Sequence, residues 1–280
     1  MLRPTIGETI MTRLKNCNAL ITGAASGLGL LMAEQLLAAG AAHVTLWDIN
    51  DTALNVAVER LRAAGYAVHG CVVDITSTAA MDAALADMDA RGISVDVLIN
   101  NAGIIVGTPF VAQTDAAIDR EMAINAIAPM HLTLRILPRM MAANRGHLVT
   151  IASAAGLVSN PRMAVYCASK WAAVGWSDSI RLELAQAGSA VKVTTVTPYY
   201  TTTGMFAGVR SPIIPIIEPI AVVRAVLAGI QRNAIWVRTP WIVTILPLVR
   251  GLLPTTWFDV VVGKWLGVYD TMRTFTGRRS

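Results

Sequence analysis

The sequence predicts an α/β fold with a doubly wound parallel sheet and helices on both faces. Short apolar segments alternate with longer Ala- and Leu-rich stretches, which is the pattern of parallel strands joined by crossover helices. A glycine-rich turn follows the first apolar segment and opens the first helical stretch. Because α/β domains commonly reach 280 residues as one unit, we expect a single domain over residues 1–280.

Six short apolar segments predict the strands. They are residues 19–21, 44–47, 68–73, 95–99, 147–151 and 191–195. The first helix is expected over residues 27–39, since Gly40 is a favourable C-terminal stop, and residues 53–64 before Gly65 repeat this arrangement. The regularity ends after Pro198, where a segment rich in proline and glycine precedes a helical stretch over 220–231.

Composition limits the classes of function. Apolar residues make up 54% of the chain and charged residues only 15%, so we expect some apolar surface to meet a partner or lipid. The net charge of +5 is spread thinly. No basic stripe carries interleaved aromatic residues, and this argues against nucleic-acid binding.

The cysteines and the start of the chain bear on the compartment. Cys17, Cys71 and Cys167 lie far apart without a Cys-x-x-Cys or Cys/His ligand pattern, so we expect neither a disulfide framework nor a metal site. This pattern fits a reducing compartment. Charged residues interrupt positions 1–16, which therefore resemble neither a signal peptide nor a spanning helix. We expect a cytoplasmic protein.

The first strand is joined to the first helix by the glycine-rich turn Thr22-Gly23-Ala24-Ala25-Ser26-Gly27-Leu28-Gly29. There a dinucleotide pyrophosphate can meet unpaired backbone N–H groups and the positive end of the helix dipole. The residues expected to bind the cofactor are Gly23, Ser26, Gly27, Leu28 and Gly29. The alternative is a turn whose glycines serve only strand-to-helix packing.

The choice of cofactor depends on Asp48, at the end of the second strand. A carboxylate here can accept hydrogen bonds from the adenosine ribose hydroxyls, and it repels a 2′-phosphate. Ala25, Ile49 and Asn50 supply no positive charge for such a phosphate. The sequence therefore favours NAD over NADP. The alternative is that Asp48 only caps the next turn.

Three polar residues further along the chain suggest acid/base chemistry. Tyr166 and Lys170 are four residues apart and so share one helix face, and Ser153 precedes Tyr166 by thirteen positions. A neighbouring ammonium and a positively charged nicotinamide favour the phenolate of a phenol whose pKa is ordinarily ~10. Tyr166 can therefore donate and accept a proton near neutral pH. The alternative is a surface Tyr/Lys pair on a helix.

Together these motifs resemble the short-chain dehydrogenase/reductase family over roughly residues 15–230. The residues that carry the resemblance are the turn 22–29, Asp74, Asn100-Asn101-Ala102-Gly103, Asn125, Ser153, Tyr166, Lys170 and Pro198. The resemblance implies a Rossmann-like fold with a seven-stranded parallel sheet. It implies Asp74 and Ile75 around the adenine, Asn101, Ala102 and Gly103 beside the adenosine ribose, and Thr201 and Thr203 at the nicotinamide carboxamide. Alternatively, residues 100–103 form an ordinary strand-ending turn and Asp74 caps a helix.

The resemblance also implies a catalytic set of Asn125, Ser153, Tyr166 and Lys170. Tyr166 would exchange a proton with the substrate oxygen, to which Ser153 donates a hydrogen bond, while hydride passes between substrate and nicotinamide. Lys170 would bind the nicotinamide ribose and lower the Tyr166 pKa. Asn125 would hold a water that connects Lys170 to solvent. Taken alone, Asn125 could instead bond locally within a helix.

The segment from Pro198 to Phe206 and the C-terminal pattern around residues 246–278 narrow the resemblance. They are similar to enzymes such as retinol dehydrogenase 10 and 17-beta-hydroxysteroid dehydrogenase 11, which oxidise lipophilic alcohols. The animal enzymes carry an N-terminal membrane anchor that we do not expect here. Substrate contacts are expected from Ser153, Tyr166 and an apolar wall. That wall comprises Met205, Phe206, Ile213, Ile214, Ile216 and Ile217, although these residues could instead fill a core of the lid itself.

Residues 235–268 are apolar and contain four tryptophans among basic residues. Aromatic residues beside basic ones suit a membrane interface, so peripheral membrane contact is one interpretation of this region. Prolines interrupt it and disfavour a spanning helix. The competing interpretation is an apolar subunit interface in a homodimer or homotetramer.

These observations lead to one leading hypothesis. It is an NAD-dependent oxidoreductase that interconverts a hydrophobic secondary alcohol, such as a hydroxysteroid, and its ketone. The second hypothesis is a retinol-like or long-chain primary alcohol dehydrogenase, and the third is a non-catalytic NAD-sensing protein. The expected parts of the domain are a Rossmann-like cofactor-binding and catalytic core over 15–198, a substrate lid and following helix over 199–231, and an apolar C-terminal extension over 232–280.

Overall fold

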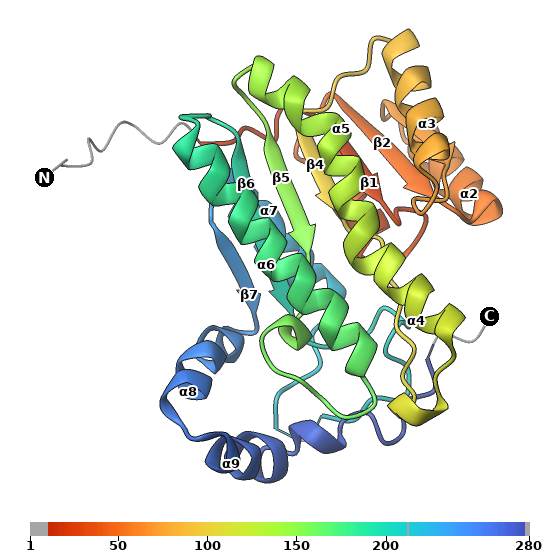
Figure 1. The fold of residues 1–280 in the computed structure, drawn as a ribbon. Coiled ribbons are helices and arrows are strands. Elements are labelled where there is room, and N and C mark those ends of the chain that lie inside the picture. The colour runs from red at the N-terminus through yellow and green to blue at the C-terminus, as the bar shows by residue number, and fades with distance from the viewer. Residues whose placement is uncertain (1–10, 212, 278–280) are drawn as a thin grey trace, which may run out of the picture.

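A computed structural model describes residues 11–211 and 213–277, and its centre is a seven-stranded sheet (Figure 1). The strands are β1 (Asn18–Thr22), β2 (His43–Asp48), β3 (Val68–Val72), β4 (Val97–Asn100), β5 (His147–Ile151), β6 (Lys192–Pro198) and β7 (Trp236–Thr239). Their order is β3-β2-β1-β4-β5-β6-β7, and every neighbouring pair is parallel. The predicted Rossmann-like architecture is confirmed.

Helices cover both faces of this sheet. They are α1 (Gly27–Ala38), α2 (Asp51–Ala63), α3 (Thr78–Ala90), α4 (Asp115–Met122), α5 (Ala128–Ala142), α6 (Ala164–Gln186) and α7 (Pro219–Gln231). Successive strand side chains point to opposite faces. Ile21 therefore joins the core under α1, α2 and α7, while its neighbour Leu20 joins the core under α3, α5 and α6.

The order of the strands creates a crevice at one edge of the sheet. From β1 the chain moves outward through β2 to β3, and it then returns to place β4 on the other side of β1. The connections after β1 and β4 therefore leave the sheet in opposite directions. At such a switch point the carboxyl ends of the strands form the usual ligand-binding crevice of an open α/β sheet.

The last part of the chain extends beyond the carboxyl ends of the strands (Figure 1). After β7 come short helical pieces. They are η4 (Trp241–Thr244), α8 (Leu246–Leu252), α9 (Thr255–Phe258), η5 (Asp259–Trp265) and η6 (Val268–Asp270). Their apolar side chains form a third core cluster with Tyr166, Tyr199 and Tyr200. The segment predicted as a C-terminal extension thus supplies both a strand of the sheet and a layer that packs against these tyrosines.

Within the described part of the chain, no helix has the length and apolar character needed to cross a membrane. The expectation that the chain starts without a signal or spanning segment concerns residues 1–16. Positions 1–10 lie outside the described residues, as does Arg278 at the end of the C-terminal pattern.

Candidate active site

Backbone geometry in the glycine-rich turn requires glycine at two positions. Gly23 has a φ of +64°, and a Cβ there would lie 2.8 Å from the Cα of Ala102. A Cβ at Gly29 would lie 2.2 Å from the carbonyl oxygen of Gly23. Ser26 and Leu28 occupy the N-cap and the first turn of α1. The turn therefore brings backbone amides close to the crevice, as anion binding at a helix N-terminus requires.

Asn101, just after β4, holds this turn in place. Its Nδ2 donates to the carbonyl oxygens of Thr22 and Gly23 at 2.9 and 3.0 Å. The Thr22 hydroxyl in turn accepts hydrogen bonds from the backbone N–H groups of Asn101 and Ala102 at 3.0 and 3.1 Å. These contacts join the ends of β1 and β4 across the switch point.

Asp48 lies beside the same turn. Its Oδ2 accepts a hydrogen bond from the Ala25 N–H at 2.9 Å, and its Oδ1 accepts one from the Asn50 N–H at 3.0 Å. The cap of α2 is Asn50, whose side chain accepts a hydrogen bond from the Ala53 N–H. The Asp48 carboxylate is therefore fixed at the carboxyl end of β2, where the ribose of a dinucleotide lies in this fold.

Asp74 makes local contacts in the loop after β3. Its Oδ1 accepts hydrogen bonds from the N–H and the hydroxyl of Thr76 at 2.9 and 2.7 Å. Ser77 then caps α3. Asp74 is exposed and Ile75 is half-buried. The Asp74 side chain stabilises this turn, and the helix cap expected as its alternative role is made by Ser77 instead.

Two threonines after β6 lie on the other side of the crevice. Thr201 forms an isolated parallel bridge with Ile217, and its hydroxyl lies 3.2 Å from that of Thr203. A Cβ at Gly27 would lie 3.7 Å from the Cβ of Thr203. The structure thus brings Thr203 next to the glycine-rich turn, although the two are far apart in sequence.

The three residues with acid/base character meet where β5 and α6 approach each other. Lys170 Nζ donates to the carbonyl oxygen of Ile151 at 2.9 Å and lies 5.7 Å from the centre of the Tyr166 ring. Ser153 follows β5, and its hydroxyl forms a hydrogen bond with Tyr166. Tyr166 and Lys170 are each only 4% exposed. They are therefore not a surface pair.

Asn125 lies in a π-helical turn, η2 (Ala123–Ile127), between α4 and α5. Its Oδ1 accepts from the Ile104 N–H at 2.8 Å, and its Nδ2 donates to the Ile104 carbonyl at 2.9 Å and to the Ser169 hydroxyl at 3.0 Å. A Cβ at Gly103 would lie 3.2 Å from Asn125 Oδ1 and 3.5 Å from Lys170 Nζ. The structure therefore brings Asn125 and Lys170 together around Gly103.

Burial dominates the proton affinities of the site. It raises the pKa of Tyr166 above its ordinary value, and the hydrogen bond with Ser153 acts in the opposite direction. Burial also lowers the pKa of the Lys170 ammonium to about 8, and the carboxylate of Glu121 opposes this change. Bringing the Tyr166 pKa toward neutral therefore requires nearby positive charge to outweigh the effect of burial.

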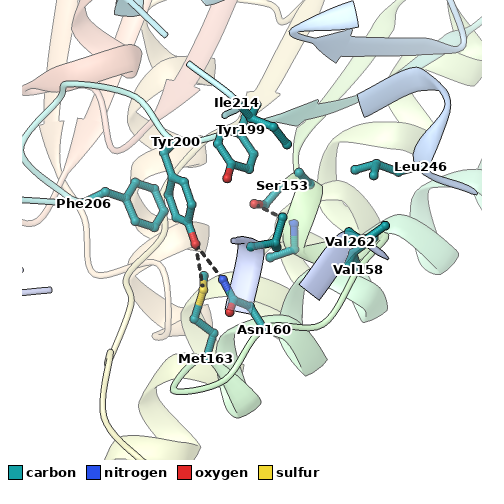
Figure 2. Close-up of a pocket in the computed structure, with 13 residues that line it drawn as sticks. Ser153, Val158, Asn160, Met163, Tyr199, Tyr200, Phe206, Ile214, Leu246 and Val262 are labelled. Atoms are coloured by element: carbon teal, nitrogen blue, oxygen red, sulfur yellow. Dashed lines mark hydrogen bonds between the residues drawn. The ribbon is translucent and has the colours of Figure 1, made fainter. Parts of the chain in front are cut away.

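A cavity adjoins these residues (Figure 2). Ser153 lies on its wall, and so does Phe206, whose ring meets that of Tyr166 edge-to-face at 6.1 Å. The remaining wall is mainly apolar and includes Val158, Tyr199, Ile214, Leu246, Val262 and Val268. Three of these come from the C-terminal segment. Sequence analysis did not predict that contribution, because no local pattern connects those residues to Ser153.

The predicted apolar wall forms only in part. Phe206 and Ile214 line the cavity, whereas Ile213 is 52% exposed and Ile216 is 36% exposed. Met205 is half-buried and is not among the lining residues. The segment folds so that alternate apolar side chains face in and out, which a count of apolar residues does not reveal.

The cavity also contains a polar cluster that sequence analysis missed. Asn160 Nδ2 donates to the hydroxyl oxygens of Tyr200 and Thr271 at 3.0 and 2.8 Å. The Tyr200 hydroxyl also donates to the sulfur of Met163 at 3.4 Å, as Figure 2 shows. These contacts connect the loop after β5, the segment after β6 and the C-terminal segment. They fix one end of an otherwise apolar cavity.

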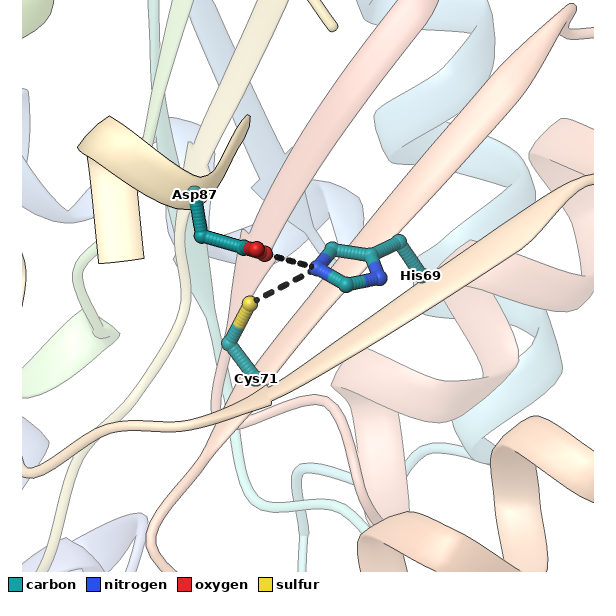
Figure 3. Close-up of side chains that lie close together, drawn as sticks. All are labelled: His69, Cys71 and Asp87. Carbon is teal, nitrogen blue, oxygen red and sulfur yellow. Dashed lines mark hydrogen bonds and ion pairs between the residues drawn. The ribbon is translucent and has the colours of Figure 1, made fainter. Parts of the chain in front are cut away.

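A separate cluster joins β3 to α3 (Figure 3). His69 Nε2 lies 2.7 Å from Asp87 Oδ2 and 3.2 Å from Cys71 Sγ, and ligand atoms of the three residues lie within 4.8 Å of one another. The sequence analysis found no Cys/His ligand pattern, yet alternate positions 69 and 71 of a strand share a face. Arg91 also donates to both Asp87 oxygens, at 3.0 and 2.9 Å, and burial raises the pKa of Cys71 to about 11. The three side chains form a hydrogen-bonded link between β3 and α3.

The outer surface of the C-terminal segment carries exposed apolar side chains. Trp241 is 74% exposed, Trp257 64% and Trp265 72%. Leu248 and Leu252 on α8 are exposed as well. We call these five residues the C-terminal apolar surface. It lies on the same elements that supply Leu246 and Val262 to the cavity.

A doubly wound parallel sheet with a glycine-rich turn at its first crossover defines a class of dinucleotide-binding proteins. Residues 17–213 match the family model described as short chain dehydrogenase. The chain therefore belongs to the short-chain dehydrogenase family, as the sequence motifs predicted.

Two relatives agree with the narrower resemblance. Epidermal retinol dehydrogenase 2 of Mus musculus is 34% identical over 265 residues, which cover 93% of this chain and 85% of that protein. Estradiol 17-beta-dehydrogenase 11 of Pongo abelii is 34% identical over 254 residues, which cover 90% and 84%. The predicted membership in a subgroup with such enzymes is confirmed.

Solved structures share the fold closely. A short-chain dehydrogenase/reductase from Burkholderia phymatum in complex with NAD has a TM-score of 0.77 and 27% identity, and the match covers 91% of this chain and 98% of that one. A short-chain dehydrogenase from Sphingobium yanoikuyae in complex with NADPH has a TM-score of 0.73 and 28% identity, with 91% and 95% covered. These relationships support a nicotinamide cofactor, and the choice between its two forms depends on residues of this chain.

Proposed function

We propose that the protein is an NAD-dependent oxidoreductase that interconverts a hydrophobic secondary alcohol and its ketone. The observation that carries this proposal is the apolar cavity lined by Ser153 and by Phe206, whose ring meets that of the buried Tyr166. An apolar cavity with Ser153 on its wall favours a lipophilic molecule that presents an oxygen to Ser153 and Tyr166.

The residues of the chain divide the work of this reaction between binding and proton transfer. The glycine-rich turn and the first turn of α1 would hold the pyrophosphate of the dinucleotide. NAD, when bound, supplies hydride transfer at its nicotinamide ring. During oxidation Tyr166 would accept the proton of the substrate hydroxyl as hydride leaves the carbon that bears this hydroxyl. Ser153 would orient the hydroxyl oxygen. Lys170, held by Ile151, would bind the nicotinamide ribose and favour the phenolate.

Asp48 supports NAD as the preferred form of the cofactor. Its carboxylate is held by two backbone N–H groups at the end of β2, so it cannot easily turn away. A fixed negative charge there would accept ribose hydroxyls and repel a 2′-phosphate. The neighbouring Ala25, Ile49 and Asn50 offer no cation to offset that repulsion.

A primary alcohol such as a retinoid is the second candidate substrate. It is favoured by the mouse relative, epidermal retinol dehydrogenase 2, which is as similar to this chain as the estradiol dehydrogenase is. Both substrate classes are elongated and apolar, so the cavity suits either. Incubation with NAD and a panel of steroid alcohols, retinol and aliphatic alcohols, followed by NADH absorbance, separates them.

The matched variants Tyr166→Phe and Tyr66→Phe test whether the protein is an enzyme that uses Tyr166 for proton transfer. We expect Tyr166→Phe to lose roughly 10²–10⁴-fold in kcat, because it removes the acid/base group and little else. Tyr66 lies between α2 and β3, so its variant should retain full turnover. NADH binding, measured by fluorescence, should persist in both. If Tyr166→Phe turned over alcohol at the normal rate, the mechanism would be wrong, and a protein that bound NAD without oxidising any alcohol would fit the sensing role.

We further propose that the C-terminal apolar surface contacts a lipid interface. Exposed tryptophans beside Arg250 and Lys264 have the composition of an interfacial surface. Cosedimentation with anionic phospholipid vesicles should weaken in a Trp257→Gln/Trp265→Gln double variant. It should be unchanged in Leu182→Gln, which makes an exposed residue of α6 polar. If the double variant instead converts a dimer or tetramer to monomers, the surface is a subunit interface.

A further inference from the structure

Glu121 is a buried acidic residue in a helix that is otherwise exposed or half-buried. Within α4 it is the one buried residue, with 0% of its surface exposed. Its Oε1 accepts a hydrogen bond from the Val106 N–H at 3.1 Å, whereas its Oε2 is buried without a protein partner among the described residues. A buried carboxylate with one unpaired oxygen is costly, so its retention calls for an explanation beyond packing.

Glu121 shares its environment with the catalytic residues. One helical turn later, Asn125 binds both backbone groups of Ile104, so Glu121 and Asn125 hold the same segment after β4. That segment begins at Gly103, which lies against Lys170 Nζ. The carboxyl of Glu121 therefore holds the segment that runs past the Lys170 ammonium.

Lys170 needs a counter-charge in this place. It is 4% exposed, and the described residues place no carboxylate within 4.0 Å of its Nζ. Its ammonium donates to a neutral carbonyl, that of Ile151. Glu121 is the acidic group whose charge acts on Lys170, and it also acts on Tyr166 and Cys167. A buried cation without an opposite charge nearby loses its proton readily.

We propose that Glu121 is a positioning residue that acts through Lys170 and Tyr166. Its buried carboxylate balances the Lys170 ammonium and sets the pH range over which Tyr166 exchanges its proton. The inference rests on the proposed alcohol dehydrogenase function and adds one group to its proton-handling machinery. The ionisable groups on which the Glu121 charge acts are Lys170, Tyr166 and Cys167 on α6, while residues 104–106 contribute no ionisable side chain.

The direction of the effect follows from charge. Burial raises the pKa of Glu121 to about 7, so its carboxyl becomes negative as the pH rises through neutrality. A negative Glu121 raises the pKa of both the Lys170 ammonium and the Tyr166 phenol. Replacing it by a neutral side chain should therefore move both groups to lower pKa.

Glu121→Gln is the test, because glutamine keeps an oxygen for the Val106 N–H and removes the charge. In NAD-dependent alcohol oxidation, both limbs of the kcat/KM profile should move to lower pH by roughly one unit. The matched control is Asp119→Asn, which removes the same charge from an exposed position of α4. Its profile should coincide with that of the wild-type protein.

A second measurement needs no turnover. In cofactor-free protein, the thermal midpoint of Glu121→Gln relative to wild type should rise as pH increases from 5 to 8. The sign follows because a carboxyl whose folded pKa is raised destabilises the folded state as it ionises. Glu121→Asp, which keeps the charge, should retain the wild-type limb positions even if its rate falls.

Two results would overturn the inference. One is a Glu121→Gln pH profile that coincides with wild type or moves no more than that of Asp119→Asn. The other is a Glu121→Asp profile shifted as far as that of Glu121→Gln, since packing rather than charge would then be responsible. If the wild-type protein oxidises no alcohol, the proposed function fails. The thermal measurement then decides alone: a difference that levels off near pH 7 means that Glu121 ionises in the folded state, whereas a difference still rising at pH 8 rejects a charged Glu121.

Discussion

The cofactor side and the substrate side of the crevice are built in different ways. On the cofactor side, backbone meets backbone: the turn before α1 packs on the loop after β4, and glycines admit contacts that any Cβ would block. On the substrate side, side chains from three distant segments pack together around a cavity. The first arrangement tolerates almost no change, whereas the second can be reshaped one side chain at a time.

The largest expected effect is that of Gly29→Ala on the cofactor side. Its Cβ would meet the Gly23 carbonyl oxygen at 2.2 Å, so the turn must shift. We expect a loss of about 1–3 kcal/mol in stability or binding-competent geometry, up to roughly 100-fold in NADH affinity. Gly175→Ala is the matched control, because this helical glycine has nothing within 4 Å of its added Cβ. It should gain roughly 0.5–1 kcal/mol in stability and bind NADH normally.

Fluorescence titration with NADH and chemical denaturation measure both variants. Equal NADH affinity in Gly29→Ala and Gly175→Ala would show that the cofactor side is as adaptable as the substrate side, contrary to the difference described above.

Acid stability depends on a residue that belongs to neither side. His147, at the start of β5, is 0% exposed and contacts the hydroxyls of Thr12 and Thr194. Burial lowers its pKa from 6.5 to about 4. Because its folded pKa is depressed, protonation favours unfolding, and stability falls as the pH decreases from about 6.5 to 4. The full contribution is about 3 kcal/mol.

Glu121 acts with the opposite sign over part of this range, so the wild-type profile alone does not isolate His147. The informative quantity is the difference in unfolding free energy between wild type and His147→Gln. That difference should shrink by about 3 kcal/mol from pH 7 to pH 4. His131→Gln, at an exposed position, is the matched control. If cofactor binding and cavity-ligand binding were lost at different pH values, the two sides would not share one folding unit.

Local patterns were sufficient for the sheet and for the cofactor motif. Strands such as residues 147–151 are short, mainly apolar and followed by a turn. Parallel strands that are buried on both faces show this pattern irrespective of their position in the sheet. The position of Asp48 beside the glycine-rich turn was predictable because it depends on a fixed separation in sequence from that turn. By contrast β7 has four residues, one of them an arginine, and gave no such pattern.

The substrate side could not be predicted in the same way, because its contacts are long-range. Leu246 and Val262 reach the cavity only after α8 and η5 fold back beside Tyr166. Glu121 stands in the charged sequence Asp119-Arg120-Glu121, which is typical of an exposed helix. Only the packing of α4 turns it inward. Pairing of His69 with Cys71 was accessible from strand alternation, but the third partner, Asp87, comes from the next helix.

A smaller effect is expected on the cofactor side when Asp48 is replaced. Asp48→Ala removes the charge that opposes a 2′-phosphate, so the ratio of kcat/KM for NAD to that for NADP should fall by roughly 10–100-fold. Asp51→Ala, which removes a carboxylate from the exposed first turn of α2, should leave the ratio within about twofold. Steady-state kinetics with each cofactor measure it. An unchanged ratio in Asp48→Ala would mean that another group selects the cofactor.

The smallest expected effect falls on the substrate side and compares two valine-to-alanine changes. Val262 is 2% exposed and lines the cavity, whereas Val226 is 1% exposed in the core beneath α7. Each variant should lose roughly 1–2 kcal/mol of stability, since each removes about two buried methylene equivalents. Only Val262→Ala enlarges the space beside the substrate.

The two variants should therefore differ in their selectivity between alcohols. Val262→Ala should raise the kcat/KM of a bulkier alcohol relative to a smaller one by up to about tenfold, because a methylene in an apolar pocket is worth ~1 kcal/mol or slightly more. The ratio should stay constant in Val226→Ala, and NADH affinity should be unchanged in both. If Val226→Ala altered selectivity equally, the change would come from general loosening of the fold. If NADH affinity fell in Val262→Ala, the substrate wall and the cofactor turn would be mechanically connected, and the independence of the two sides would be lost.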